Sequence, residues 1–479
     1  MLNKTKILCT IGQQSENEKV LEEMILEGMN VARLNLVNGN LNIQKRYIDT
    51  IKKLSLIHDH TLGIMLDTFG PKVRCHSFQN SLESIAKGCK ITIHCNEEIL
   101  GNSSEFSTNY SGLFDDVDID ETILLNSGSV KLLVINKNEK DRTIECESLN
   151  SGMVQDGCLV NIPNKKTSLN CLNNEDVSLL RFANSSGVDY IAASFIRDEK
   201  DILEIKQYLK EIDSKMLVYA KIENNQAIYN FDKILQEADG IIISRGDLSI
   251  EVDYETLPIV LKKIVRKCNM AGKPVIVGTQ ILSSMTRNKK PSRAEVADVA
   301  NLVLDGVDGI SLTNVTTIGQ YPTLAIKELK KIIETSEKYA DELKIHNVAE
   351  ETSCNDEVQG LDDAVAFAVL STSYRVNAKL IVAFSESGAT AKRIAKYRPA
   401  CPIASVSSDG NIRMALVLHW GIYPVIASHK TYEIDFVSLA QEIAIYYGLK
   451  EGDTFIITGG SGIGNTNLMK VCKVKWDMP

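Results

Sequence analysis

Residues 217–247 read LVYAKIENNQAIYNFDKILQEADGIIISRGD and contain one complete unit of the fold. Two apolar runs, Leu217–Glu223 and Ile241–Asp247, flank a stretch with helical character. The runs are continuous rather than alternating, which is typical of parallel strands buried on both faces. Both runs end in charged residues. The segment therefore predicts a strand–helix–strand unit with polar side chains at the carboxyl ends of its strands.

Six further runs of this kind occur along the chain, and amphipathic helical stretches separate most of them. Eight strand–helix units favour an α/β fold, a closed (β/α)8 or TIM barrel. Enzymes with this fold have their active sites at the carboxyl ends of the strands. The six other runs are Lys6–Thr10, Val31–Asn35, Leu62–Thr68, Tyr190–Phe195, Val275–Gln280 and Gly309–Thr313.

The predicted strand ends supply cations, carboxylates and hydroxyls to one rim. Glu223 and Asp247 suit a Mg²⁺ or Mn²⁺ ion, because such ions prefer oxygen ligands. Lys221 lies on the same strand face as Glu223 and would neutralise a phosphate or carboxylate held by the metal. A plain salt bridge at the rim is the structural alternative. The full set is Arg33, Asn35, Asp67, Thr68, Lys221, Glu223, Asp247 and Thr279.

Two of these residues have further candidate roles. Arg33 could hold a phosphate with two parallel hydrogen bonds, although a pair with Asp67 is the alternative. The Thr279 hydroxyl could orient a substrate or relay a proton.

The third and fourth runs are separated by a long insert that begins at Gly70-Pro71. It contains short segments rich in β-branched residues, separated by Asn, Ser, Gly and Asp. This pattern predicts a small all-β domain inserted at the catalytic rim, where it could close as a lid. Its expected strands are Cys89–Cys95, Thr122–Leu125, Val130–Ile135 and Thr143–Glu147.

A polar stretch, Asn347–Gly360, is expected to link the barrel to an open C-terminal α/β domain. That domain has predicted strands at Leu380–Phe384, Ile403–Val406, Tyr423–Ile426 and Phe455–Thr458. Ser385, Ser387, Gly388 and Thr390 follow the first of them and could cradle a phosphate, or form a plain capping turn. The expected domains are residues 1–69 and 169–345 for the barrel, 70–168 for the lid and 346–479 for the C-terminal domain.

Bulk properties exclude several functional classes. The net charge of −9 argues against non-specific nucleic-acid binding, and no apolar run is long enough for a membrane span. The eleven cysteines are scattered without a Cys-x-x-Cys motif, which is typical of reduced thiols in a cytoplasmic protein.

Several stretches of the chain carry a family resemblance: Thr5–Gly12, Met29–Asn35, Leu66–Thr68, Gly70-Pro71, Ser194–Arg197, Lys221–Asn224, Arg245–Leu248, Ala271–Val275, Thr279-Gln280 and Pro291–Glu295. Taken together, they resemble pyruvate kinase over essentially the whole chain. The resemblance implies a barrel, a lid domain, a C-terminal regulatory domain and a homotetramer. It also implies phosphate transfer from phosphoenolpyruvate to ADP, giving pyruvate and ATP, and a sugar-phosphate effector.

The resemblance also implies roles for single residues. Glu223 and Asp247 match the family's divalent-metal ligands, and Lys221 matches the lysine that stabilises the transferring phosphoryl group. Substrate contacts are implied for Arg33, Gly246, Asp247 and Thr279, and nucleotide contacts for Arg74 and Asn35.

Departures from the family pattern concern the nucleotide and a monovalent cation. Gln13, Asn38, Asn126 and Cys158 replace residues of the nucleotide side, so weaker or less selective ADP binding is expected. Many members hold K⁺ near Asn35, Asp67 and Thr68. Here Val37 replaces a serine ligand and Lys72 replaces a nearby glutamate, so Lys72 is expected to stand in for K⁺.

Two alternatives to an active pyruvate kinase remain open from the sequence. One is a catalytically weak relative that binds phosphorylated metabolites. The other is a barrel lyase acting on a pyruvate-like enolate, which would need the metal and the arginine but no ADP.

Overall fold

The computed structural model describes residues 3–35, 40–163, 165, 167–343, 360–427, 436–460 and 466–475. The chain forms two compact units. One contains residues 1–66, 188–190 and 262–479, and the other contains residues 67–187 and 191–261.

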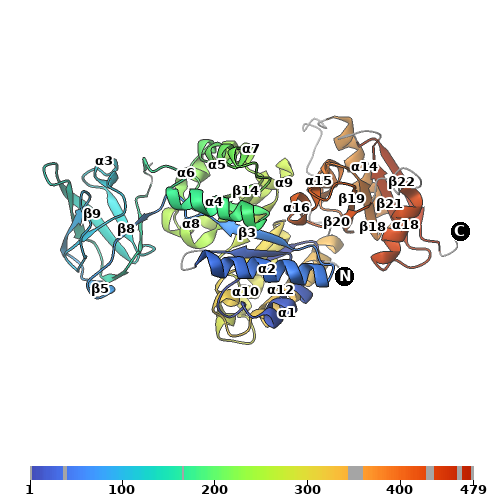
Figure 1. The fold of residues 1–479 in the computed structure, drawn as a ribbon. Helices are drawn as coiled ribbons and strands as arrows, with labels where there is room; N and C mark the ends of the chain where they lie inside the picture. The colour runs from blue at the N-terminus through green and yellow to red at the C-terminus, as the bar shows by residue number, and fades with distance from the viewer. Residues whose placement is uncertain are drawn as a thin grey trace. The chain divides into compact units, whose positions relative to one another are not determined.

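Eight strands close into a barrel in the order β1-β17-β16-β15-β14-β13-β3-β2, and this confirms the predicted fold class (Figure 1). Every strand except β1 ends earlier than predicted, because the polar residues after each apolar run leave the sheet. The strands are β1 (Lys6–Thr10), β2 (Val31–Leu34), β3 (Gly63–Asp67), β13 (Tyr190–Ala193), β14 (Leu217–Ile222), β15 (Gly240–Ser244), β16 (Val275–Gly278) and β17 (Gly309–Leu312).

The prediction that Asp247 ends a strand is wrong. Strand β15 stops at Ser244, and helix α8 (Arg245–Glu251) begins directly after it. Asp247 lies in the first turn of that helix, where the helix dipole favours a carboxylate. The apolar run ends at Ile243, and Arg245 and Asp247 are only partly buried, so the chain leaves the sheet before them.

The helices around the barrel begin at strong sequence signals. Asn17, Asn40, Asn173, Asp198 and Asn224 each accept a hydrogen bond from a backbone amide of the helix they precede. The helices are α1 (Glu18–Leu26), α2 (Leu41–Ile57), α4 (Asn174–Ser186), α5 (Glu199–Glu211), α6 (Asn225–Tyr229), α7 (Phe231–Glu237), α9 (Leu257–Ala271), η1 (Ser283–Thr286), α10 (Arg293–Leu304), α11 (Asn314–Thr317) and α12 (Pro322–Leu343).

A repeated clamp joins barrel strands at their amino ends. An Asn or Asp directly before a strand exchanges two hydrogen bonds with a neighbouring strand: its side chain accepts an amide N–H, and its own amide donates to the same residue. The pairs are Asn30 with Ile7, Asp189 with Ile64, Asp239 with Val218 and Asp308 with Val275. These side chains fix the amino ends of the strands, at the end of the barrel away from the candidate catalytic residues.

The insert is an all-β domain apart from one short helix, α3 (Leu113–Asp116). Its main sheet has the order β4-β12-β8-β9-β10-β6-β7, and β5 pairs with β11. Buried apolar side chains alternate with exposed ones along β9 and β10. The strands are β4 (Val73–Arg74), β5 (Leu82–Ile85), β6 (Lys90–His94), β7 (Glu105–Ser107), β8 (Thr122–Leu125), β9 (Val130–Asn138), β10 (Thr143–Ser148), β11 (Gly152–Gln155) and β12 (Leu159–Asn161).

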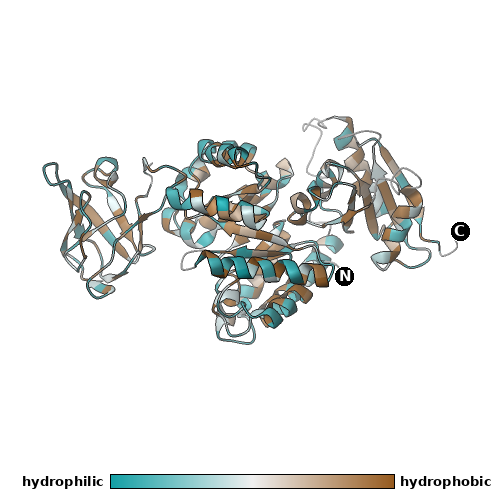
Figure 2. Cartoon of the chain, in the orientation of Figure 1, coloured by the Kyte–Doolittle hydropathy of each residue, from teal (hydrophilic) through white to brown (hydrophobic). Residues whose placement is uncertain are grey.

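The C-terminal domain is an open sheet of order β20-β19-β18-β21-β22 with apolar clusters on both faces; Figure 2 shows the hydrophobic strands. Strand β22 is antiparallel to β21, and the sequence analysis missed it because its side chains are largely exposed. The elements are α14 (Leu361–Arg375), β18 (Leu380–Phe384), α15 (Ala389–Lys396), β19 (Ile403–Ser407), α16 (Ile412–Val417), β20 (Ile422–Ile426), α18 (Phe436–Tyr446), β21 (Thr454–Gly459) and β22 (Leu468–Lys473).

One expectation falls on residues whose structure is not described. The linker expected at Asn347–Gly360 falls outside the described residues except for Gly360. Within the described part of the chain, no helix is long and apolar enough to cross a membrane.

Candidate active site

Lys221 is the centre of the polar cluster at the end of β14. Its ammonium nitrogen lies 3.2 Å from Asp67 Oδ2 and 2.9 Å from Glu223 Oε1, and it donates a hydrogen bond of 3.0 Å to Ser194 Oγ. The Lys221 side chain is only 5% exposed. An ammonium group buried among oxygens is a fixed positive charge, and the low dielectric constant of the protein interior strengthens its interaction with a nearby anion.

Glu223 is ionised although it is buried. Burial alone would raise the pKa of its carboxyl group, but the ammonium groups of Lys221 and Lys72 outweigh burial and lower that pKa to about 2. The amide of Phe195 also donates a 2.8 Å hydrogen bond to Glu223 Oε2. Phe195 has a left-handed backbone conformation (φ 54°), which costs energy for a bulky residue and aims its N–H at the carboxylate.

The Asp247 carboxyl group has a raised pKa, because nearby positive charge does not fully offset its burial and the Glu223 charge. Burial and the nearby Glu223 carboxylate raise its pKa to about 6, against the opposing effect of Lys221 and Lys72. Glu223 is buried and Asp247 is half-buried, and a further cation would stabilise two carboxylates that lie so close together. The donor set of Glu223 and Asp247 therefore fits a divalent metal that prefers oxygen.

Lys72 belongs to the same electrostatic cluster. Burial and the Lys221 charge lower its pKa, while Glu223 and Asp247 act to raise it. Its ammonium nitrogen lies 4.7 Å from the centre of the Phe195 ring, a cation–π contact.

The turn before Lys72 is held tightly. Asp176 accepts hydrogen bonds from the amides of Phe69 and Gly70, at 2.7 and 3.2 Å. Gly70 has φ +70°, and a Cβ there would meet the Ser194 carbonyl oxygen at 2.4 Å. Only glycine fits this turn.

Ser194 and Asp176 are positioning residues to which the sequence analysis gave no role. Ser194 accepts from Lys221, and its own amide donates to Thr68 Oγ1 at 2.9 Å. Ser194 was visible as part of a matching stretch, but no residue pattern reveals that Asp176, on α4, caps a loop more than a hundred residues earlier.

The structure therefore brings Asp67, Thr68, Lys72, Lys221 and Glu223 together, with Asp247 in electrostatic contact with Glu223. All six lie in one compact unit.

Arg33, Asn35 and Thr279 belong to the other compact unit. Arg33 is a buried residue of β2, and Asn35 follows that strand. Thr279 follows β16 with φ 65°, and Gln280 continues at φ 57°. A β-branched residue in this region is strained by about 1–3 kcal/mol, and such strain is concentrated at functional sites. Val37 and Asn38 lie outside the described residues.

Arg74 lies on β4, at the edge of the inserted sheet. Its guanidinium donates a 2.8 Å hydrogen bond to the carbonyl oxygen of Gly157. A cavity opens beside it whose lining includes Lys72, Phe195, Asn161 and Glu251.

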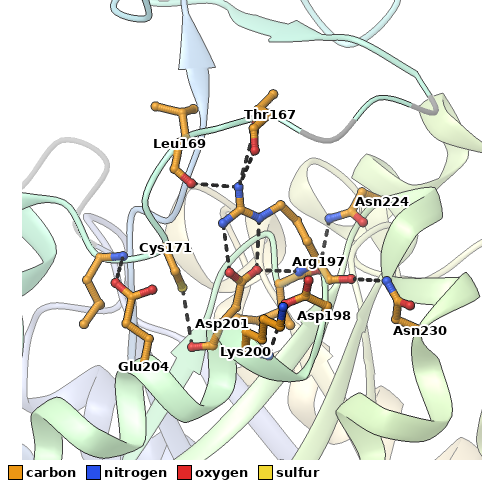
Figure 3. Close-up of polar contacts among 12 residues, drawn as sticks. Thr167, Leu169, Cys171, Arg197, Asp198, Lys200, Asp201, Glu204, Asn224 and Asn230 are labelled. Carbon is orange, nitrogen blue, oxygen red and sulfur yellow. Dashed lines mark hydrogen bonds and ion pairs between the residues drawn. The ribbon is translucent and has the colours of Figure 1, made fainter. Parts of the chain in front are cut away.

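The chain returns from the insert to the barrel at an ion pair that Figure 3 shows. Arg197 donates 2.8 and 3.0 Å hydrogen bonds to both carboxylate oxygens of Asp201, and to the carbonyl oxygens of Thr167 and Leu169. Cys171 and Glu204 lie near Asp201. Because Arg197 already neutralises Asp201, we interpret this cluster as a structural anchor rather than a metal site.

The candidate phosphate cradle in the C-terminal domain is largely occupied by internal contacts. Gly388 has φ +70°, the Thr390 hydroxyl bonds to Thr466 Oγ1 at 2.8 Å, and the Thr390 amide donates to Ser385 Oγ at 3.5 Å. Ser387 lies between them, and its buried hydroxyl oxygen has no hydrogen-bond partner among the described residues.

Comparison with known proteins identifies the family. Residues 2–326 match the model described as "Pyruvate kinase, barrel domain", and residues 363–472 match "Pyruvate kinase, alpha/beta domain". The pyruvate kinase of Sporosarcina psychrophila is 39% identical over 477 residues, and that of Staphylococcus epidermidis is 38% identical over 474; both alignments cover 98% of this chain and 80% of the relative.

A solved pyruvate kinase structure from Cryptosporidium parvum superimposes with a TM-score of 0.91 at 31% identity, covering 99% of this chain and 97% of that one. The inserted β-domain, the barrel and the C-terminal sheet are thus all found in a solved member. The chain belongs to the pyruvate kinase family, whose members transfer a phosphoryl group from phosphoenolpyruvate to ADP.

Proposed function

We propose that phosphoenolpyruvate and ADP react at the Lys221 cluster to give pyruvate and ATP. The observation that supports this most is the Lys221 ammonium, held by the Asp67 and Glu223 carboxylates and by Ser194. Phosphoryl transfer requires charge neutralisation and in-line positioning more than covalent participation by the enzyme. These contacts hold the Lys221 ammonium in place, so its positive charge can stabilise the negative charge on the transferring phosphoryl group without reorganisation of the site.

Glu223 and Asp247 are the proposed ligands of Mg²⁺ or Mn²⁺. The low pKa of Glu223 and the raised pKa of Asp247 support this, because one ligand is always ionised and the other is short of positive charge. When bound, the metal would neutralise substrate oxygens as a Lewis acid.

The remaining roles follow the family match. Arg33 is proposed to hold the phosphate, and Gly246 and Asp247 to contact substrate at the start of α8. The Thr279 hydroxyl is proposed to orient the substrate or relay a proton beside the enolate. Arg74 and Asn35 are proposed on the nucleotide side, with residues 70–168 as a lid over it.

Lys72 is proposed to replace K⁺. Its position among Lys221, Glu223 and Asp247 supports the idea, because a lysine there supplies covalently the positive charge that a monovalent cation would bring. Asp67 and Thr68 would then serve as positioning residues rather than as K⁺ ligands.

Three finer assignments complete the proposal. Ser385, Ser387, Gly388 and Thr390 would bind a sugar-phosphate effector, and the unpartnered Ser387 hydroxyl supports this. The protein would be a homotetramer. A cytoplasmic location is supported by the described cysteines, which are free thiols.

A coupled assay tests the proposed reaction. Phosphoenolpyruvate, ADP and Mg²⁺ are expected to give pyruvate and ATP in equal amounts, and no product should form without ADP. Neither product forming would instead indicate a catalytically weak relative or a lyase with another substrate. Pyruvate formed without ADP would require release of inorganic phosphate and would indicate hydrolysis of phosphoenolpyruvate rather than transfer to a nucleotide. The double variant Glu223→Gln/Asp247→Asn is the control for contaminating activity.

A further inference from the structure

Two cysteines lie directly opposite each other where the chain enters and leaves the inserted domain. Strands β4 and β12 are antiparallel, with Leu159 opposite Arg74 and Val160 opposite Val73. Continuing this register by one residue places Cys158 opposite Cys75. The Cys75 amide donates a 3.0 Å hydrogen bond to the Cys158 carbonyl oxygen, and the two sulfur atoms are 3.4 Å apart in an S–H···S hydrogen bond.

This geometry suits a covalent bond between the sulfurs. The single hydrogen bond from the Cys75 amide to the Cys158 carbonyl oxygen holds the two backbones side by side, and the sulfurs already lie 3.4 Å apart. Closing the bond requires the sulfurs to approach by little more than an ångström, to about 2.05 Å. Rotation about the two Cα–Cβ bonds can supply this without moving the strands.

Cys75 and Cys158 are 3% and 4% exposed and belong to the apolar core of the inserted domain. An oxidant therefore reaches them only when β4 opens locally, which breaks its contacts with residues 107–109. The hydrogen bond with Cys75 lowers the pKa of Cys158 against the opposing effect of burial, and the Arg74 charge acts in the same direction as the hydrogen bond. The same hydrogen bond and burial raise the pKa of Cys75. A thiolate is the form that reacts with oxidants.

We propose that Cys75 and Cys158 form a reversible redox pair that a hydroperoxide closes into a disulfide. The Cys158 thiolate attacks the peroxide, the O–O bond breaks, and hydroxide or alkoxide leaves, giving a sulfenic acid. The Cys75 sulfur then attacks the Cys158 sulfur, the S–O bond breaks, and water leaves with the Cys75 proton. Two electrons pass from the sulfurs to the peroxide. Two molecules of a small thiol then reduce the Cys75–Cys158 disulfide by exchange and leave as their own disulfide.

The disulfide would tie the entering strand to the leaving strand. Arg74 precedes Cys75 and donates to the carbonyl oxygen of Gly157, which precedes Cys158, so the bond would restrain both ends of that contact. We expect the oxidised enzyme to have a higher KM for ADP and an unchanged KM for phosphoenolpyruvate. This consequence rests on the proposed nucleotide role of Arg74, whereas formation of the disulfide does not.

Peptide mass spectrometry tests the site directly. The full chain is treated with hydrogen peroxide, alkylated under denaturing conditions and digested. A peptide joining Cys75 to Cys158, lighter by two hydrogen atoms than its parts, is expected, and dithiothreitol should abolish it. Cys158→Ser should lack this peptide, whereas Cys89→Ser, which removes an exposed thiol of the same domain, should keep it.

Two results would overturn the proposal. One is oxidation of Cys89 in the wild type while Cys75 and Cys158 both remain open to alkylation. The other is pairing of Cys158 with a different cysteine. If the disulfide forms but the KM for ADP does not rise several-fold, the coupling to Arg74 is wrong and the redox pair stands.

Discussion

The Lys221 ammonium lies 3.2 Å from Asp67 and 2.9 Å from Glu223. Its positive charge is thus placed before substrate arrives. Ser194 Oγ accepts a further hydrogen bond from Lys221, and the Phe195 amide holds the Glu223 carboxylate. Two roles are compatible with such a residue: stabilising the transition state, or binding the substrate phosphate uniformly. The two differ in their effect on kcat.

Lys221→Met should lower kcat by at least about a hundredfold and change KM for phosphoenolpyruvate much less, because the charge is needed most when the phosphoryl group moves. Steady-state kinetics with both substrates varied would measure the split. Lys200→Met, on the outer helix α5, is the matched control and should leave both constants unchanged. A rise in KM with normal kcat would mark Lys221 as a uniform binding residue.

Asp247→Asn should weaken Mn²⁺ binding and lower turnover by orders of magnitude, because the amide keeps the shape of the side chain but removes a charge from the metal site. Titration calorimetry with Mn²⁺ in the presence of phosphoenolpyruvate would report the binding change separately from activity. Near-normal Mn²⁺ affinity in this variant would show that the metal ligands lie elsewhere.

The turn that carries Lys72 depends on one glycine. Gly70 and Gly88 both have positive φ, but a Cβ at Gly70 would meet the Ser194 carbonyl at 2.4 Å, whereas nothing lies within 4 Å of one at Gly88. Both Ala substitutions should incur the left-handed cost of about 1–2 kcal/mol. Gly70→Ala should lose further stability and most of its activity, and Gly88→Ala should remain active. Thermal unfolding and turnover of the pair would decide this, and equal behaviour would contradict it.

The strand clamps give a prediction about pH. Burial raises the pKa of Asp189 to about 6, although the Ile64 amide and the Lys52 charge oppose this. The folded state therefore binds more protons than the unfolded chain between about pH 4 and 6, so the contribution of Asp189 to stability falls as pH rises through that window.

Asp189→Asn, which copies the natural Asn30 clamp, should therefore raise the midpoint of thermal unfolding at pH 7.5 and have little effect at pH 4. Asp239 makes the same clamp but is paired with Lys206 at 3.0 Å, so Asp239→Asn should give no such gain. Thermal melts of the three proteins at both pH values would test this. A loss of stability in Asp189→Asn at pH 7.5 would refute the linkage.

The sequence predicted the elements well where burial alone sets the pattern. Continuous apolar runs located all eight barrel strands, because strands covered on both faces are mostly apolar and carry their few polar residues near their ends. It failed at edges: β22 is largely exposed and contains two lysines, and Asp247 lies in a helix that begins where a strand seemed to continue.

The site was predicted in part for the same reason. Strand ends are visible in a sequence, so Lys221, Glu223 and Asp67 could be named in advance. Asp176, Ser194 and the Cys75–Cys158 pair could not be assigned, because their roles come from contacts that only the folded chain creates. The local sequence pattern predicts which residues form a strand, but it does not predict which residues far away in the sequence contact that strand.

The whole molecule has the fold of the pyruvate kinase family, but Lys72 replaces a glutamate of the family pattern beside the Lys221 cluster. The central claim is that Lys72 interacts electrostatically with Lys221, Glu223 and Asp247 and supplies the positive charge that K⁺ supplies in many family members. Lys72→Glu should lose most activity and regain little with KCl, because Val37 still leaves a K⁺ site short of one ligand. Lys87→Glu, an exposed change of equal charge in the same domain, should behave as wild type.

The most direct test is the turnover of the wild-type enzyme with phosphoenolpyruvate, ADP and Mg²⁺ in tetramethylammonium buffer, measured with and without added KCl at constant ionic strength. The account predicts the same turnover in both buffers. A turnover that depends strongly on added KCl would contradict it.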